Sequence, residues 1–226
     1  MLHEHGIPPP FAFVYDEFWQ IFRSLEPFLS HVLGAGYRML PDLWVWYVLP
    51  SNRASGWVPH RDRVVPTLQP DNTPNSLTVW LPLTAATPLN GCMYVLPAAY
   101  DPDLHNPGVS VGSKFHFTDE NVQNIRALPA PAGSLLAWNQ ALVHWGGRAS
   151  DLGTAPRCSI ALQFQRGDVP ALEDMLLDPH VLPSLEERVG LIGRLITVFS
   201  GFLSFPPEVR VLATALEWKY WRAMRR

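Results

Sequence analysis

The sequence predicts a mainly β fold with flanking helices, and three observations carry that prediction. Between Pro59 and Gln165, short apolar runs alternate with Pro, Asn and Gly, which is typical of a sandwich or barrel of short strands. Before this stretch, and again after Gly167, apolar residues recur at helical spacing. The 226 residues, 47% of them hydrophobic, are enough for one compact core.

The N-terminal segment, residues 1–42, is expected to be a helical cover. From Tyr15 to Leu33 the apolar spacing indicates a helix that Pro27 interrupts and Asp16 caps. The next run, Leu43 to Leu49, is rich in β-branched and aromatic residues without a helical period. This run predicts a buried strand that opens the β core.

The central segment, residues 43–167, is expected to form that core. Within it, the dipeptide Asn90-Gly91 favours a tight hairpin turn. The Pro- and Asn-rich stretch from Ala98 to Asn121 is expected to be a loop over the mouth of the fold, where loops often contact substrate. Cys92 and Cys158 lie in apolar, strand-like runs, which favours buried thiols over a disulfide.

The C-terminal segment, residues 168–226, is expected to be helical. Ser184 and Glu187 form a capping-box pattern ahead of an apolar run. The run from Val189 to Phe205 is too short and too mixed for a membrane span, so it predicts a buried or oligomer-facing helix. A final helix from Pro207 is apolar on two sides, which hints at a homodimer through the C-terminal helices.

Composition argues against two classes of partner. A formal net charge of −3 with 16% charged residues gives no basic patch for nucleic acid. The N-terminal residues lack the basic and apolar regions of a secretory signal, so a cytoplasmic location without a membrane partner is expected.

The residues most suggestive of chemistry are His60-Arg61-Asp62 and a distant His144. Alternate side chains of a strand leave on the same face, so His60 and Asp62 could hold one ion while Arg61 points away as an outward-facing spacer. His144 would come from a different strand. Two imidazoles and one carboxylate leave one side of an octahedral ion open, an arrangement that suits non-heme Fe(II). A single H-x-D is common by chance, so the motif needs support.

Support comes from Arg157, which begins an alternating run. Its spacing puts Arg157 and Ser159 on one face of a predicted strand. A planar guanidinium with a hydroxyl beside it is a good receptor for a carboxylate.

Four segments resemble the phytanoyl-CoA dioxygenase-like branch of the Fe(II)/2-oxoglutarate-dependent oxygenases, over about residues 45–167. They are Trp57 to Asp62; Ser76 to Thr84 running into Pro88 to Pro97; Ala132 to Trp138 before His144; and Arg157 to Ser159. The second segment is the most specific, because its apolar strand, Pro-x-Asn-Gly turn and second strand ending in proline recur together in that family. The resemblance implies a double-stranded β-helix, the jelly-roll or cupin-like barrel, as a single catalytic domain over residues 1–226.

The resemblance also implies roles for individual residues. The implied Fe(II) ligands are His60, Asp62 and His144. Arg157 would pair with the distal carboxylate of 2-oxoglutarate, and Ser159 would add a hydrogen bond to it. Trp80 falls where the family often places an aromatic residue against the co-substrate, although an ordinary core tryptophan is an equal interpretation.

The implied reaction consumes O2 and 2-oxoglutarate, releases succinate and CO2, and hydroxylates an unactivated C–H bond. A small metabolite or natural-product intermediate is the expected substrate. Because Asp62 fills the carboxylate position, halogenation is not expected, while desaturation or cyclisation stays open. The chain departs from the pattern at residues 145–150, which follow the distal histidine, and this departure weakens any inference about the substrate.

Two other classes of function compete with the oxygenase. His60-Arg61-Asp62 also spells a kinase catalytic tripeptide, but that motif needs an Asn where this chain has Thr67, and its Gly-rich and Asp-Phe-Gly elements do not occur. A non-catalytic jelly roll that binds a metal or a small ligand stays open. The joint presence of Asp62, Arg157 and Ser159 argues against it.

Overall fold

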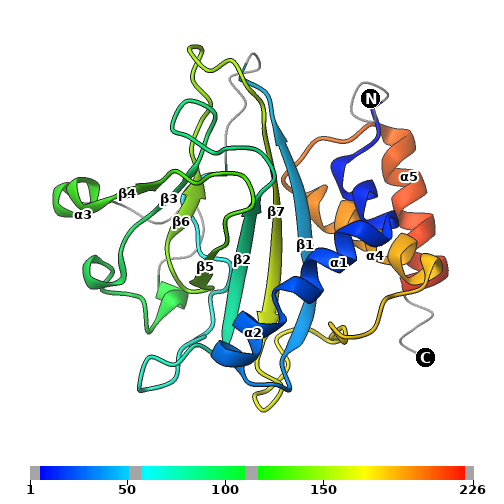
Figure 1. Ribbon diagram of the computed structural model, residues 1–226, viewed down its shortest axis with the longest axis horizontal. Coiled ribbons are helices and arrows are strands. Elements are labelled where there is room, and N and C mark those ends of the chain that lie inside the picture. The colour runs from blue at the N-terminus through cyan, green and yellow to red at the C-terminus, as the bar shows by residue number, and fades with distance from the viewer. Residues whose placement is uncertain (1–5, 51–56, 110–116, 222–226) are drawn as a thin grey trace. The chain divides into compact units, whose positions relative to one another are not determined.

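The protein is described by a computed structural model that covers residues 6–50, 57–109 and 117–221 (Figure 1). Helices open and close this part of the chain, and strands fill most of its middle. The prediction of a mainly β fold with flanking helices is confirmed. The chain divides into two compact units, Met1–Val45 with Leu162–Arg226, and Trp46–Ala161. The single catalytic domain expected over residues 1–226 stays a prediction.

Two helices precede the first strand. A 3-10 turn at Pro9–Val14 leads into α1 (Asp16–Ser24) and α2 (Glu26–Leu33). The interruption expected near Pro27 is confirmed, since Pro27 lies in the first turn of α2, where a missing amide hydrogen costs nothing. The prediction that Asp16 caps the helix is wrong. Tyr15 occupies the cap position, and Asp16 instead accepts a hydrogen bond from Arg188.

In the described residues the strands form two sheets. The larger contains, in order, β1 (Arg38–Val48), β7 (Arg157–Gln165), β2 (Ser76–Pro82) and β5 (Leu136–Asn139). The smaller contains β4 (Arg126–Leu128), β3 (Met93–Val95) and β6 (His144–Gly146). β2 pairs antiparallel with β5, and β3 pairs antiparallel with both β4 and β6. Neither sheet is closed into a barrel.

The Asn90-Gly91 dipeptide forms a turn, but the expected hairpin is wrong. Gly91 has a φ of 86°, and the Asn90 side chain accepts a hydrogen bond from the Thr87 amide at 2.7 Å. A Cβ at position 91 would collide with the carbonyl oxygen of Gly147, which explains the glycine. The strands on either side, β2 and β3, belong to different sheets. The turn therefore carries the chain from one sheet to the other.

The stretch expected to be a loop contains short helices. Two 3-10 turns, Ala98–Tyr100 and Pro107–Val109, are followed by α3 (Asp119–Asn124). Residues 110–116 of this stretch lie outside the described residues. Cys92 is buried and Cys158 half-buried, and both are free thiols, as expected.

The C-terminal segment contains α4 (Leu185–Phe199), α5 (Pro207–Leu216) and a π-helical turn at Glu217–Trp221. The capping box of Ser184 and Glu187 is confirmed, with each residue's side chain accepting from the other's amide. The helix expected to reach Phe205 ends earlier because a turn at residues 201–203 breaks it. Figure 1 shows α4 beside α5.

The last helix leaves much of its apolar surface exposed in the single chain. Ala213 is the buried residue of α5, whereas Val211 is 72% exposed. The homodimer expected through the C-terminal helices stays a prediction. The basic C-terminal residues 222–226 lie outside the described residues. Among the helices that the structure describes, none has the length and apolar character needed to cross a membrane.

Candidate metal centre

His60 and His144 lie on neighbouring stretches of backbone. The amide of each donates to the carbonyl oxygen of the other at 3.0 Å, which forms an isolated antiparallel bridge. His144 is the first residue of β6, as predicted for a ligand from a separate strand. Asp62, however, lies in a bend and not in a strand. The argument from strand alternation is therefore wrong, and the bend brings Asp62 to the histidines instead.

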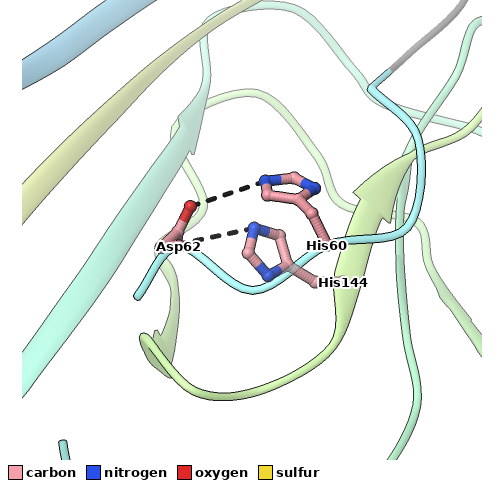
Figure 2. Close-up of side chains that lie close together, drawn as sticks. All are labelled: His60, Asp62 and His144. Atoms are coloured by element: carbon pink, nitrogen blue, oxygen red, sulfur yellow. Dashed lines mark ion pairs between the residues drawn. The ribbon is translucent and has the colours of Figure 1, made fainter. Parts of the chain in front are cut away.

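The three side chains converge on one point (Figure 2). His60 Nε2 lies 3.5 Å from Asp62 Oδ1, and His144 Nε2 lies 3.5 Å from Asp62 Oδ2. One donor atom from each residue lies within 4.8 Å of the other two. Ligands about 2.0–2.2 Å from an ion and at right angles to one another are roughly 3 Å apart. Small side-chain movements would therefore let the three groups surround a metal ion.

Backbone carbonyls decide which ring nitrogen faces the centre. His60 Nδ1 lies 2.8 Å from the Val58 carbonyl oxygen, and His144 Nδ1 lies 3.0 Å from that of Leu142. A carbonyl oxygen only accepts, so each Nδ1 carries the proton of these contacts. A neutral ring then presents a lone pair at Nε2, which is how metal-binding histidines are commonly oriented.

The electrostatics of the centre favour a cation. Burial, and to a lesser extent the neighbouring His60, lowers the pKa of His144 to about 4, so this ring is neutral at neutral pH. Burial alone would raise the pKa of Asp62, but at acid pH the positive charges of the protonated imidazoles and the Thr78 hydroxyl hold it well below its usual value. An ionised carboxylate thus faces the lone pair of a neutral imidazole. A bound metal ion would satisfy both.

Two residues to which the sequence analysis gave no role at the metal centre, Thr78 and Trp138, hold Asp62 in place. The Thr78 hydroxyl donates to Asp62 Oδ2 at 2.5 Å, and Trp138 Nε1 donates to the same oxygen at 3.4 Å. Thr78 in β2 and Trp138 in β5 are directly opposite each other in the strand pair. Their common target depends on this register, which a single sequence does not reveal.

A second polar feature lies at Arg157, which is 2% exposed at the start of β7. Its Nη1 donates to Ser159 Oγ at 2.7 Å, so the two residues share a face, as their spacing predicts. Its Nε has no hydrogen-bond partner, and no carboxylate of the described residues pairs with the guanidinium. Burial lowers the pKa of Arg157 to about 10, which leaves the side chain charged at neutral pH. A buried charge without an acid is costly unless a ligand supplies one.

Trp80 contacts both Arg157 and the apolar core. Its ring centroid is 5.5 Å from Arg157 Cζ, a cation–π distance. It also belongs to a buried apolar cluster with Ala86, Cys92, Met93 and Trp138. Trp80 is thus a core residue, and its contact with a co-substrate stays a prediction.

Arg61 is the residue that the sequence analysis placed wrongly. It was expected to be an outward-facing spacer, but it is 6% exposed and its guanidinium binds the carboxylate of Asp101. Charged residues are seldom this buried unless they are paired, which is the physical reason for the ion pair. The sequence held no local signal for a partner so far along the chain.

Fold and site together define a mainly β protein with a candidate metal centre of two histidines and one carboxylate. The sequence profile of the phytanoyl-CoA dioxygenase (PhyH) family matches residues 19–151, more than half of the chain. The protein belongs to that family. The matched range includes His60, Asp62 and His144 and ends before Arg157 and Ser159. The roles of all five residues stay predictions.

The solved structures found to be similar to this chain include SnoN, ThoJ and EvdMO1. SnoN, an epimerase solved with Fe3+, α-ketoglutarate and nogalamycin RO, has 18% identity and a TM-score of 0.51 over 73% of this chain and 69% of its own. The ThoJ monooxygenase–Ni complex has 18% identity and a TM-score of 0.50, over 89% and 70%. EvdMO1 has 21% identity and a TM-score of 0.46, over 63% of this chain but 30% of its own. For SnoN and ThoJ, the likeness at these identities shows the fold alone. A comparison with curated proteins finds no match.

Proposed function

We propose that this protein is an Fe(II)/2-oxoglutarate-dependent oxygenase acting on a small molecule. In this proposal His60, Asp62 and His144 hold the metal, and Arg157 with Ser159 binds the distal carboxylate of 2-oxoglutarate. The observation that carries it is that one strand, β2, contacts both the candidate metal centre and a buried guanidinium that pairs with no carboxylate of the described residues. Family membership supports the same class of enzyme.

β2 connects the two features. Thr78, which donates to Asp62, and Trp80, which stacks on Arg157, are two positions apart on this strand and so project from the same face. Positions two apart along a strand are separated by about 7 Å. One face of β2 therefore borders both a site for a metal-chelating group and a site for a carboxylate. A keto acid with a second carboxylate, such as 2-oxoglutarate, needs both.

Iron and 2-oxoglutarate, when bound, supply the oxidising chemistry that consumes O2 and releases succinate and CO2. The protein's residues provide placement and charge. The carbonyls of Val58 and Leu142 orient the two imidazoles, and Thr78 and Trp138 orient Asp62. Because Asp62 provides a carboxylate ligand, no coordination position is left for a halide in its place, which favours hydroxylation over halogenation.

The substrate is proposed to approach from the side of His60. The side chains of His144, Asp62 and His60 are 4%, 12% and 19% exposed, so the centre opens toward His60. The Trp57 ring lies 6.0 Å from the His60 ring, and the Trp46 ring lies 5.7 Å from Trp57. Two half-buried indoles beside the open side favour a small metabolite or natural-product intermediate with an apolar surface.

Hydroxylation of an unactivated C–H bond is the proposed outcome, with desaturation or cyclisation as alternatives. SnoN is an epimerase and ThoJ a monooxygenase. The fold therefore does not decide the outcome, and product analysis must.

An anaerobic titration tests the proposal. Apoprotein mixed with Fe(II) and 2-oxoglutarate is expected to develop the weak visible charge-transfer band of the chelate, and Asp62→Ala is expected to lack it. Absence of the band from the wild-type protein at saturating Fe(II) and 2-oxoglutarate would reject the assignment. A band without O2-dependent succinate, across a metabolite screen, would favour a non-catalytic binding protein.

A homodimer through the C-terminal helices is a secondary part of the proposal. The apolar side chains of Val211 and Trp218 are 72% and 63% exposed in the single chain. Exposed apolar surface often marks a protein–protein interface when it forms a contiguous patch. Sedimentation analysis tests the homodimer: the wild-type protein is expected to be a dimer and Val211→Glu a monomer. A monomeric wild-type protein would reject the homodimer.

A further inference from the structure

Arg61 and Asp101 form a buried bidentate ion pair next to the metal centre. Their side chains are 1% and 0% exposed. Arg61 Nη1 lies 2.5 Å from Asp101 Oδ2, and Nη2 lies 2.8 Å from Oδ1. Two parallel hydrogen bonds from a planar guanidinium fix direction as well as distance. The orientation of the Arg61 side chain is therefore set by Asp101.

The same guanidinium also binds the segment that leads to the third metal ligand. Arg61 Nη1 donates to the carbonyl oxygen of Ala141, in the turn just before His144. The neighbouring amide of Arg63 donates to the Gln140 carbonyl oxygen at 3.1 Å. Residues 60–63, which carry two of the ligands, are thus tied to residues 140–141, which precede the third.

Asp101 is itself held by the segment that follows β3. Its Oδ1 accepts a hydrogen bond from the Asp103 amide at 3.1 Å, and the preceding Tyr100 carbonyl accepts one from the Asn121 side chain at 2.8 Å. The ion pair therefore joins three segments: residues 60–63, 139–144 and 98–103. Two of these segments carry the metal ligands.

Stability alone is a weak explanation for such a pair. Burying two charges costs desolvation energy, and an apolar pair of similar volume often serves a folded protein equally well. The ion pair also fixes the orientation of the Arg61 side chain, because a planar guanidinium binds a carboxylate through two parallel hydrogen bonds. Since the Arg61 backbone lies between His60 and Asp62, fixing its side chain limits how both ligands can move.

From this arrangement we infer that Arg61 and Asp101 are positioning residues that hold the two ligand-bearing segments at the spacing a metal ion needs. The inference rests on the proposed metal centre. It gives a role to the central residue of His60-Arg61-Asp62, and it makes the segment after β3 part of the support of the centre.

The test is the metal affinity of a variant in which both charges are removed. Arg61→Met with Asp101→Leu leaves no buried charge unpaired. Titration with Co(II), without 2-oxoglutarate or O2, is expected to give an affinity about 10- to 100-fold below wild type, the usual effect of losing residues that support metal ligands. The melting temperature of the variant shows whether it is folded.

A matched control exists in the other compact unit. Arg188 also binds a carboxylate, Asp16, at 2.5 Å and a backbone carbonyl, Val14, at 2.9 Å. The variant Arg188→Met with Asp16→Leu removes a less buried arginine–carboxylate pair, in which Asp16 is 57% exposed, from the unit that contains no metal ligand. Its Co(II) affinity is expected to equal that of the wild-type protein.

Each result decides the inference. A folded Arg61→Met, Asp101→Leu variant with wild-type Co(II) affinity would overturn it while leaving the metal centre in place. A wild-type protein that does not bind Co(II) would remove the metal centre and the inference together. If the double variant does not fold, Arg61→Lys replaces it, because lysine keeps the charge but not the bidentate geometry. Wild-type Co(II) affinity in Arg61→Lys would then overturn the inference.

Discussion

Two buried arginines, one in each compact unit, differ in whether a carboxylate neutralises their charge. Arg188 is 6% exposed, lies over the Trp19 ring, and donates to Asp16 and to the carbonyl oxygens of Val14 and Pro183. Arg157 is 2% exposed and lies over the Trp80 ring in the same way, but within the described ranges it binds Ser159 and no carboxylate.

The difference fits our proposal that Arg188 carries a structural charge and that Arg157 pairs with the carboxylate of a ligand. Arg188 has its counter-charge within the protein and joins α4 to the N-terminal segment. Arg157 has hydrogen-bonding capacity that the protein leaves unused. Buried charged groups without a counter-charge are often found at functional sites, because a ligand of opposite charge can pair with them. Variants of the two regions should therefore differ in what they damage.

The largest effect is expected from Asp62→Ala, which removes the carboxylate of the metal centre. We expect Co(II) affinity to fall by more than about 100-fold, beyond the effect of altering a supporting residue, and O2-dependent succinate formation to reach background. The control Asp168→Ala removes a carboxylate that is 65% exposed and paired with Arg166, and should change neither quantity. If Asp62→Ala still bound Co(II) with wild-type affinity, the metal would bind at a site that does not include Asp62.

Arg157→Met is expected to weaken 2-oxoglutarate binding without harming the fold. Loss of hydrogen bonds to a charged carboxylate costs about 2–3 kcal/mol, which is roughly 30- to 150-fold in affinity. The melting temperature should not fall, because the variant also removes a buried charge that lacks an acid. Titration of 2-oxoglutarate into the Fe(II) protein, monitored by its visible band, measures the first effect. Unchanged 2-oxoglutarate affinity would contradict the role given to Arg157.

Arg188→Met is expected to do the reverse. It removes a part-buried ion pair and two hydrogen bonds to carbonyl groups, which should lower the free energy of unfolding by about 2 kcal/mol. Asp16 is 57% exposed, so water can hydrate it in the variant and the loss stays below that of a fully buried pair. Urea unfolding measures the loss, and 2-oxoglutarate affinity should be unchanged. Equal destabilisation by Arg157→Met and Arg188→Met would erase the contrast between the two arginines.

The pH dependence of the apoprotein gives a smaller effect. Burial lowers the pKa of His144 to about 4 in the folded protein, from an ordinary value of 6.5. Between these values the unfolded chain binds the proton more readily, so stability is lost as the pH falls from about 6.5 toward 4. Relative to His144→Gln, wild-type apoprotein should lose on the order of 1 kcal/mol more between pH 7 and pH 5. Urea unfolding at pH 7 and pH 5 measures this loss for both proteins. An equal loss of unfolding free energy in the wild-type protein and in His144→Gln would contradict the low pKa of His144.

Ser159→Ala should have the smallest effect. The hydroxyl accepts a hydrogen bond from Arg157 at 2.7 Å and is proposed to donate one to the co-substrate. One neutral hydrogen bond is worth about 1 kcal/mol, so 2-oxoglutarate affinity should fall roughly fivefold. The variant Ser159→Thr keeps the hydroxyl and should restore most of the affinity. A Ser159→Ala variant as impaired as Arg157→Met would mean that the serine has a larger role than a supporting hydrogen bond.

Local features of this chain were predictable because their causes lie within a few residues. Pro27 breaks the first helix through its own ring, and Ser184 with Glu187 caps α4 through a spacing of three. The failures have causes farther away. Asn90-Gly91 turns the chain as predicted, yet whether a turn closes a hairpin depends on which sheet each flanking strand joins. That choice is made by packing over the whole domain.

The sequence by itself determined which chemistry is available. Two histidines, one aspartate and an arginine near a serine are types of side chain, and their preference for metal ions and carboxylates does not depend on the fold. Only the tertiary structure decided their environment. Burial made His144 neutral, strand register brought Thr78 and Trp138 to Asp62, and the fold buried Arg61 against Asp101. Desolvation and register arise from contacts between residues far apart in the chain, and one sequence read along its length does not contain them.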